Sequence, residues 1–267
     1  INFPDSLARL WHLRGYYGAL KHNVQGIYAY YLGWYDGNPA NLDKLPPREL
    51  AMKTLEYMGG INNVLKRTKI DFEKGEYRWV VYILDQILWA YPDNTEAKEL
   101  AALTHTQLGF SSENATWRNA YLSAAKELRE GIPSEGKNHR ILRDVLKGMS
   151  PILLLNSLSI RINGPKAENE FFTINWKIKN SNIACHSELT NCVLVNREGI
   201  HNKAEVTVKI TKDKLSQFAL GEIKLSEIKN EIEVIGDGKK LNVLNDILDI
   251  FPEWFPIATH SKKIDED

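Results

Sequence analysis

The sequence has little of several features that identify whole classes of protein. Among its 267 residues only Cys185 and Cys192 are cysteines, too few for a disulfide framework or for a cysteine-based zinc site. Neither sign of charge is in excess, because 34 Lys and Arg balance 34 Asp and Glu, so the charge does not indicate a nucleic acid or an anionic membrane as partner. No apolar run approaches the roughly 18 residues of a transmembrane helix.

Common catalytic motifs are also missing. The sequence has no G-x-S-x-G nucleophile elbow, no G-K-[ST] phosphate loop and no H-E-x-x-H zinc motif. Its seven histidines are scattered without the spacing of metal ligands, so we expect no metal and no cofactor to be held within this chain. No basic segment followed by an apolar one opens the chain, so no signal peptide is visible, and the first residue, Ile1, leads us to expect that residues precede it.

Apolar and aromatic residues are plentiful, at 43% and 10%, which is enough for packed cores, and the length predicts two domains. The first 130 residues or so carry helical periodicity, interrupted by turn signals such as Asp36-Gly37-Asn38-Pro39. Gly109 is predicted to end one helix, and the break at Tyr91-Pro92-Asp93-Asn94 resembles the turn of a tetratricopeptide-like hairpin. Helices are predicted over residues 6–13, 22–33, 48–59, 75–90, 95–108 and 115–129.

The second half predicts an α+β domain. Composition changes across residues 131–138, which contain Gly, Pro and Ser and form the best candidate linker. We predict helices over residues 141–155, 211–221 and 240–251, and strands over 158–163, 171–178, 183–189, 191–196, 205–210 and 232–235. This order suits a sheet with helices on one face. The predicted boundaries are 1–131 for the helical domain, 132–140 for the linker, 141–260 for the α+β domain and 261–267 for a polar tail.

The segment from Arg14 to Tyr35 is dense in aromatic residues around His22 and Asn23. Such side chains commonly fill an interface between helices. The same segment carries hydrogen-bond donors that suit a tetrahedral anion such as a sulfate ester. Taken alone, these residues leave both interpretations open. The aromatic members are Tyr16, Tyr17, Tyr28, Tyr30, Tyr31, Trp34 and Tyr35.

Three motifs in and around this segment have a distinctive spacing. They are Trp-His-Leu-Arg-Gly-Tyr-Tyr-Gly at 11–18, His-Asn at 22–23, and Tyr-Leu-Gly-Trp-Tyr-Asp-Gly-Asn-Pro-Ala-Asn-Leu at 31–42. Together they resemble the metallo-β-lactamase-fold alkylsulfatase family, which hydrolyses sulfate esters such as dodecyl sulfate. The resemblance continues through residues 75–90, 92–94, 117–122, 163–167, 174–176 and 248–251, and so covers nearly the whole chain.

The resemblance implies a three-domain enzyme: an N-terminal hydrolase with binuclear zinc, a helical dimerisation domain and a sterol-carrier-protein-like domain. This chain resembles the second and third, so the zinc is expected in the missing N-terminal domain. The resemblance also implies a homodimer, with an alkyl sulfate or fatty molecule as ligand. His22 and Tyr35 match catalytic residues that contact the sulfate, whereas Arg14 and Asn23 are substrate-binding candidates from their chemistry alone. Lys21 departs from the family, which more often has a small hydroxyl residue there.

The α+β domain carries a hypothesis of its own, an apolar tunnel that recruits alkyl chains. An ordinary core would give the same periodicity. The candidate lining residues are Leu153, Leu154, Phe172, Ile174, Trp176, Phe218 and Phe251, of which Phe172, Trp176, Phe218 and Phe251 are the substrate-binding candidates. We therefore expect part of an alkylsulfatase that is inactive without its zinc domain; the alternative is a stand-alone, non-catalytic, dimeric lipid-binding module.

Overall fold

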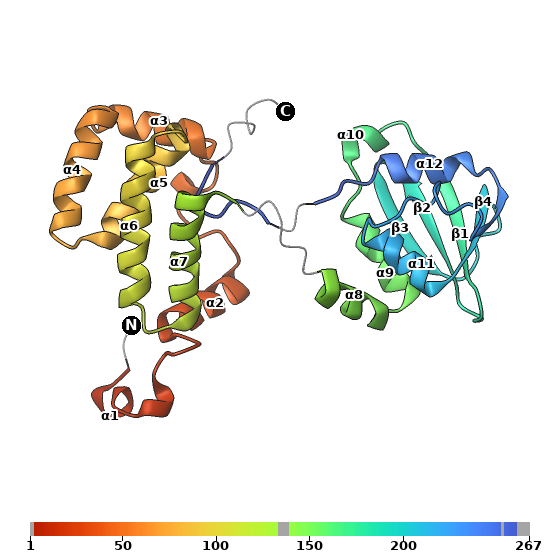
Figure 1. Ribbon diagram of the computed structural model, residues 1–267, viewed down its shortest axis with the longest axis horizontal. Coiled ribbons are helices and arrows are strands. Elements are labelled where there is room, and N and C mark those ends of the chain that lie inside the picture. The colour runs from red at the N-terminus through yellow and green to blue at the C-terminus, as the bar shows by residue number, and fades with distance from the viewer. Residues whose placement is uncertain (1–2, 133–138, 252–253, 261–267) are drawn as a thin grey trace. The chain divides into compact units, whose positions relative to one another are not determined.

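The computed structural model describes residues 3–132, 139–251 and 254–260 (Figure 1). These residues form two compact units. Residues 3–132 and 254–260 make a helical unit, and 139–251 make a unit with a sheet. A helical domain followed by an α+β domain is the predicted order. Residues 133–138 of the linker predicted over 132–140 lie outside the described residues, as does the predicted tail 261–267.

The helical unit confirms most of the predicted helices. The prediction over residues 6–13 is wrong, because two short turns separated by Arg9 and Leu10 lie there. A further helix, α4, follows Gly60 in a stretch for which no separate helix was predicted. The elements are α1 (Asp5–Ala8), η1 (Trp11–Leu13), α2 (Leu20–Leu32), η2 (Pro39–Asn41), α3 (Pro47–Tyr57), α4 (Ile61–Glu73), α5 (Tyr77–Ala90), α6 (Thr95–Ser111) and α7 (Ala115–Glu130).

Gly109 does not end α6, and that prediction is wrong. The helix continues to Ser111, and an atom added at the Cβ position of Gly109 would lie 2.7 Å from a methyl carbon of Leu122 in α7. Glycine therefore serves close packing, and α6 and α7 run side by side (Figure 1). The core of the unit is built around α5, whose Val80, Leu84 and Ile87 are fully buried. Among the described residues no helix is long and apolar enough to cross a membrane.

The α+β unit opens with two helices where one was predicted over residues 141–155. Pro151 cannot continue a helix, and the side chain of Ser150 accepts a hydrogen bond from the Leu153 N–H, so a new helix begins there. The strand predicted over 158–163 is wrong, since α9 runs to Ser159. The elements are α8 (His139–Gly148), α9 (Pro151–Ser159), α10 (Gly164–Ala167), β1 (Phe172–Ile178), β2 (Ala184–Thr190), β3 (Val193–Glu198), β4 (Val206–Ile210), α11 (Lys212–Ala219), β5 (Glu233–Gly236) and α12 (Lys239–Asp246).

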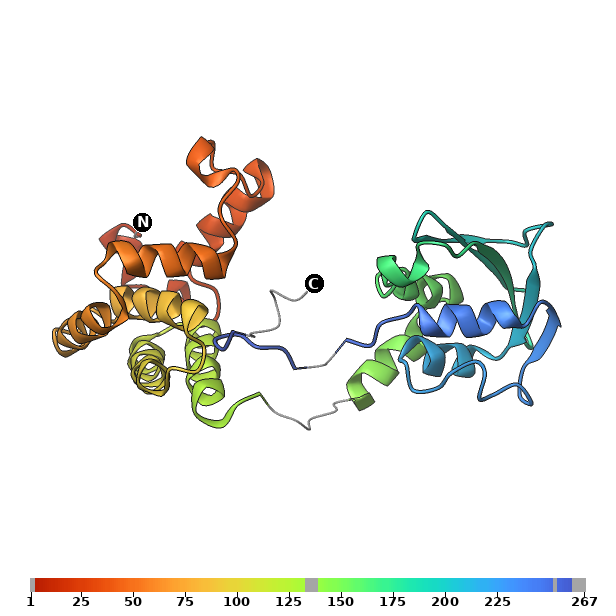
Figure 2. The same ribbon diagram turned by 90° about the horizontal axis from the view of Figure 1, so that it is seen from above.

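The five strands form one mixed sheet in the order β3-β2-β1-β4-β5. β1 pairs in parallel with β4, with Trp176 opposite Val208, and the other pairings are antiparallel. Alternate side chains of β1 are buried on one face of the sheet, and helices pack against that face (Figure 2). The core there includes Trp176 with Leu154 of α9 and Phe218 of α11. Helices on one face of the sheet confirm the predicted arrangement.

Candidate functional site

The site begins with a clamp formed by Asn114, the residue that precedes α7. Its Nδ2 donates to the carbonyl oxygens of Gly15, at 3.0 Å, and Tyr17, while its Oδ1 accepts the backbone N–H of Trp117 at 2.9 Å. The backbone N–H of Ala115 also donates to the backbone carbonyl oxygen of Tyr16. Asn114 is buried, which suits a side chain whose polar groups are satisfied in this way. It thus holds the loop before α2 against the beginning of α7.

His22, in the first turn of α2, contacts α7 through Trp117. The Trp117 Nε1–H donates to His22 Nδ1 at 3.1 Å, and the two rings meet edge to face. Because an indole N–H can only donate, Nδ1 must carry a lone pair in this arrangement. The proton of the neutral ring then sits on Nε2. His22 is exposed, so this N–H is available to a hydrogen-bond acceptor from outside.

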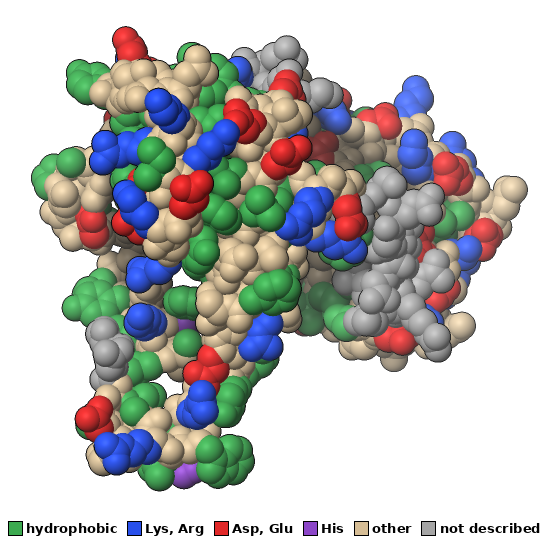
Figure 3. All heavy atoms as spheres, turned by 60° about the vertical axis from the view of Figure 1, so that its left-hand side comes forward, with side chains coloured by type: hydrophobic (Ala, Val, Ile, Leu, Met, Phe, Trp, Pro, Cys, Tyr) green, Lys and Arg blue, Asp and Glu red, His purple; other side chains and the backbone are tan. Residues whose placement is uncertain are grey.

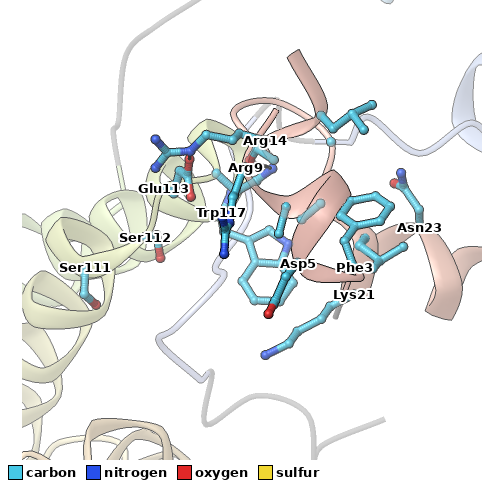
Figure 4. Close-up of a pocket in the computed structure, with 17 residues that line it drawn as sticks. Phe3, Asp5, Arg9, Arg14, Lys21, Asn23, Ser111, Ser112, Glu113 and Trp117 are labelled. Atoms are coloured by element: carbon cyan, nitrogen blue, oxygen red, sulfur yellow. Dashed lines mark hydrogen bonds and ion pairs between the residues drawn. The ribbon is translucent and has the colours of Figure 1, made fainter. Parts of the chain in front are cut away.

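Arg14 and Asn23 line one open pocket beside α2, together with Lys21, Trp117 and Glu113 (Figure 4). Arg14 forms an ion pair with Glu113, 2.6 Å from Nε to Oε1. Hydrogen bonding to Glu113 and its charge raise the pKa of Arg14, so the guanidinium stays charged. A guanidinium has five N–H donors in all, so Arg14 keeps donors that Glu113 does not use.

Tyr35 lies elsewhere. It follows the carboxyl end of α2, whereas His22 is near the beginning, and ten residues of helix between positions 22 and 32 span about 15 Å. The Tyr35 ring packs against Trp34 at 5.6 Å between centroids. The turn that follows is well ordered by Asp36, whose carboxylate accepts from the Asn38 N–H at 2.9 Å and from the Asn41 side chain. These hydrogen bonds hold the pKa of Asp36 below its usual value. The structure therefore places Arg14 and Asn23 on one pocket, with His22 bonded to Trp117, which also lines it, and leaves Tyr35 at the other end of α2.

The aromatic side chains of α2 and of Trp34, just beyond its end, are largely exposed. Tyr30 is 83% exposed, and Tyr31 and Trp34 are each 77% exposed. Hydrophobic side chains are visible on the surface of the helical unit, including the protrusion formed by α1 and η1 (Figure 3). Exposed apolar side chains gathered in one segment in this way are typical of an interaction site. We call the surface formed by Tyr28, Tyr30, Tyr31, Leu32 and Trp34 the aromatic face.

The tunnel candidates of the α+β unit lie mostly in its packed core. Phe172, Trp176 and Phe218 are 3% exposed or less, and Trp176 donates from Nε1 to Ser187 Oγ at 2.8 Å. Leu154 and Ile174 are buried with them, while Leu153 and Phe251 are exposed. Within the part of the chain that the structure describes, no group of three or more His, Cys, Asp or Glu is arranged to hold a metal ion.

Three residues of the site were not found from the sequence. Asn114 and Trp117 act on a loop and a histidine that lie 95 to 99 positions earlier in the chain. Asn114 can be recognised in the sequence as the capping residue of a helix, but its hydrogen bonds to the loop before α2 have no sequence signal. Glu113 is one of many surface acids, and only the fold pairs it with Arg14.

Both halves of the chain match known families. Residues 1–131 match the alkyl sulfatase dimerisation family and residues 140–260 the alkyl sulfatase C-terminal family. An alkyl/aryl-sulfatase of Saccharomyces cerevisiae is 39% identical over 260 residues, 97% of this chain and 40% of that protein. An (R)-specific secondary-alkylsulfatase of a Pseudomonas species is 41% identical over 261 residues, 96% of this chain and 39% of its own length.

Solved structures give the same result. The stereoselective inverting sec-alkylsulfatase from a Pseudomonas species superposes with a TM-score of 0.86 at 38% identity, over 97% of this chain and 41% of that one. The chain thus spans about 40% of the length of the relatives that it matches.

Proposed function

Because the chain belongs to the alkylsulfatase family through its dimerisation and C-terminal domains, we propose that it is part of an enzyme that hydrolyses alkyl sulfate esters such as dodecyl sulfate. The products are an alcohol and sulfate. In this proposal the helical unit joins two chains and lends side chains to the sulfate site, and the α+β unit recruits the alkyl chain. Relatives named as alkylsulfatases that match nearly all of this chain support it.

The aromatic face is the single observation that carries the helical unit's role. Its side chains are exposed on a domain whose family is described as a dimerisation domain. A second copy of the same surface would cover them, as expected for a homodimer with two-fold symmetry. Aromatic residues dominate the energy of such interfaces. We therefore place the homodimer contact on the aromatic face.

His22 is the best candidate for contact with the sulfate group. Trp117 fixes its ring so that Nε2–H faces outward, which suits donation to a sulfate oxygen or to the oxygen of the leaving alcohol. Arg14 and Asn23 add charge and an amide to the same neighbourhood. Tyr35 can approach the substrate only from the other end of α2, so its contact would be made separately.

Among the described residues no group of three or more His, Cys, Asp or Glu is arranged as metal ligands. The binuclear zinc that the family resemblance implies is proposed to be held by an N-terminal domain outside this sequence. It follows that this chain alone is expected to bind the substrate without hydrolysing it.

The α+β unit is proposed to be sterol-carrier-protein-like, as the α5–α6 pair is proposed to be tetratricopeptide-like. Its buried candidates, Phe172, Trp176 and Phe218, would have to separate before an alkyl chain could enter between them. Phe251 and Leu153 are already exposed, and an alkyl chain could cover them without opening the core. We place the first contact with the alkyl chain there.

Calorimetric titration of the chain with dodecyl sulfate, below the concentration at which it forms micelles, tests the proposal. We expect saturable binding, weaker binding of dodecanol, and no release of sulfate. His22→Gln should weaken the binding of dodecyl sulfate far more than that of dodecanol, because the charged sulfate group of the ester is the stronger acceptor for Nε2–H. Release of sulfate by the chain would contradict the inactive role, and equal binding of ester and alcohol would contradict the sulfate contact.

A further inference from the structure

A second cleft lies in the helical unit, between α5, α6, α7 and the returning segment 254–260. Its volume is about 330 Å³, at the lower end of the range for small-molecule sites. It shares no lining residue with the pocket beside α2. The proposed sulfatase function does not use it.

The returning segment is a fixed wall of this cleft. The backbone N–H groups of Ile257, Ala258 and Thr259 all donate to the Glu127 carboxylate, at 2.8 to 3.2 Å. The ring of His260 stacks on Trp89 with 3.7 Å between centroids. Ile257 and Ala258 line the cleft directly. The cleft is therefore formed before any ligand arrives, which lowers the entropy cost of binding.

Two polar groups in the cleft can accept further hydrogen bonds. His105 Nδ1 is covered by protein and has no hydrogen-bond partner, the one such buried side-chain atom among the described residues. Burial lowers the pKa of His105, so the ring is neutral and can hold a lone pair on Nδ1. The Asp85 side chain is 46% exposed, and one of its oxygens lies 3.0 Å from His260 Nε2. Both groups accept hydrogen bonds.

The rest of the lining favours a cation. Tyr82 and Tyr121 contribute aromatic rings, and no Lys or Arg lines the cleft. The centroids of the His105 and Tyr121 rings lie 5.9 Å apart, and the ring planes are tilted by 40°, so the two rings are neighbours in the lining of the cleft. Aromatic faces attract cations, and a carboxylate binds an ammonium group through charge-assisted hydrogen bonds. An anion would meet the Asp85 charge instead.

We propose that this cleft binds a primary ammonium ion with a short apolar chain. The ammonium group donates to Asp85 and, once the His105 ring turns its covered Nδ1 toward the cleft, to that atom as well. The chain lies against the apolar wall that Leu88, Ala101 and Ile257 provide. Since His260 uses the same carboxylate, the ammonium ion and His260 compete for Asp85. A water molecule could satisfy His105 alone, but it would use neither the charge nor the rings.

Titration of the full chain with n-butylammonium, followed by NMR, tests this proposal. We expect saturable binding, with 1-butanol and tetramethylammonium each at least about tenfold weaker, because one lacks the charge and the other the N–H donors. Asp85→Asn and His105→Phe should each weaken binding by about tenfold or more, and His260→Gln should strengthen it several-fold. Glu130→Gln is the matched control on α7, exposed and outside the cleft.

Two results would overturn the proposal. Butylammonium that binds no better than butanol would show that Asp85 does not select a charge. Unsaturable binding would show that the cleft has no ammonium site, and saturable binding unchanged by His105→Phe would show that the ammonium group does not contact His105. Because two variants from different helices report on the same site, the misfolding of one would leave the other decisive.

Discussion

Replacing Glu127 should release the returning segment from the helical unit. Glu127 is 8% exposed and accepts hydrogen bonds from three successive backbone N–H groups and from the Thr259 hydroxyl, the last at 2.7 Å. A hydrogen bond to a charged group contributes about 1.5–3 kcal/mol. The four hydrogen bonds are lost together when the segment detaches, so their energies do not add. We therefore expect Glu127→Ala to cost about 3 kcal/mol rather than the sum of four separate hydrogen bonds.

Hydrogen exchange of the amides of Ile257, Ala258 and Thr259 measures this loss locally. A cost of about 3 kcal/mol corresponds to exchange that is faster by roughly 100-fold or more. Glu127→Gln should lose about half as much, since it keeps one carbonyl acceptor without the charge. Glu130→Ala, on the same helix but exposed, should leave the three amides unchanged. Wild-type exchange rates in Glu127→Ala would refute the reasoning.

The same contact predicts a dependence on pH. Burial alone would raise the pKa of Glu127, but the hydrogen bonds from Thr259, Ala258 and Ile257 outweigh it and hold the pKa below its usual value. A carboxyl whose pKa is lower in the folded state stabilises the fold above the ordinary pKa of about 4.3. That contribution is lost as the pH falls through the lowered value. Protection of the three amides should therefore fall in acid, and in Glu127→Gln it should not change with pH in this range.

Two further predictions concern single contacts. Trp117→Phe removes the N–H that orients His22, so we expect dodecyl sulfate to bind a few-fold more weakly while the dodecanol affinity and the melting temperature stay near those of the wild type; an unchanged sulfate affinity would argue against the orienting role. Ser187→Ala leaves the buried Trp176 N–H without its acceptor, so we expect a loss of about 2 kcal/mol in denaturant unfolding of the α+β unit, and a loss below about 0.5 kcal/mol would count against the hydrogen bond.

Local signals explain which parts of the fold could be predicted. The hydrophobic periodicity of α5 and the alternation in β1 are strong, and both elements were found close to their true bounds. The helical periodicity predicts one helix across Pro151, because apolar residues continue on both sides of it, whereas the proline starts a new helix. The sequence predicts a helix end at Gly109, because the packing of Leu122 against this glycine is a tertiary effect without a local signal.

The site could be predicted only in part, because tertiary contacts leave no local signal in the sequence. His22, Arg14 and Asn23 lie close together in the chain, so their shared neighbourhood could be predicted. Trp117 reaches His22 across 95 positions, and Thr259 reaches Glu127 across 132, and neither contact has a local signal. Alternation in β1 marked Trp176 as facing inward, but a core and a tunnel give the same pattern, and only the structure shows the side chain packed.

The mass of the chain in solution tests the central proposal most directly, because joining two chains is the role assigned to the aromatic face. Light scattering should give twice the mass of one chain for the wild type. The double variant Tyr31→Asp/Trp34→Asp should give the mass of one chain, since buried charges without partners oppose association. Ile235→Asp, an exposed apolar position on β5, should remain dimeric. A wild-type chain with the mass of a monomer would contradict the account.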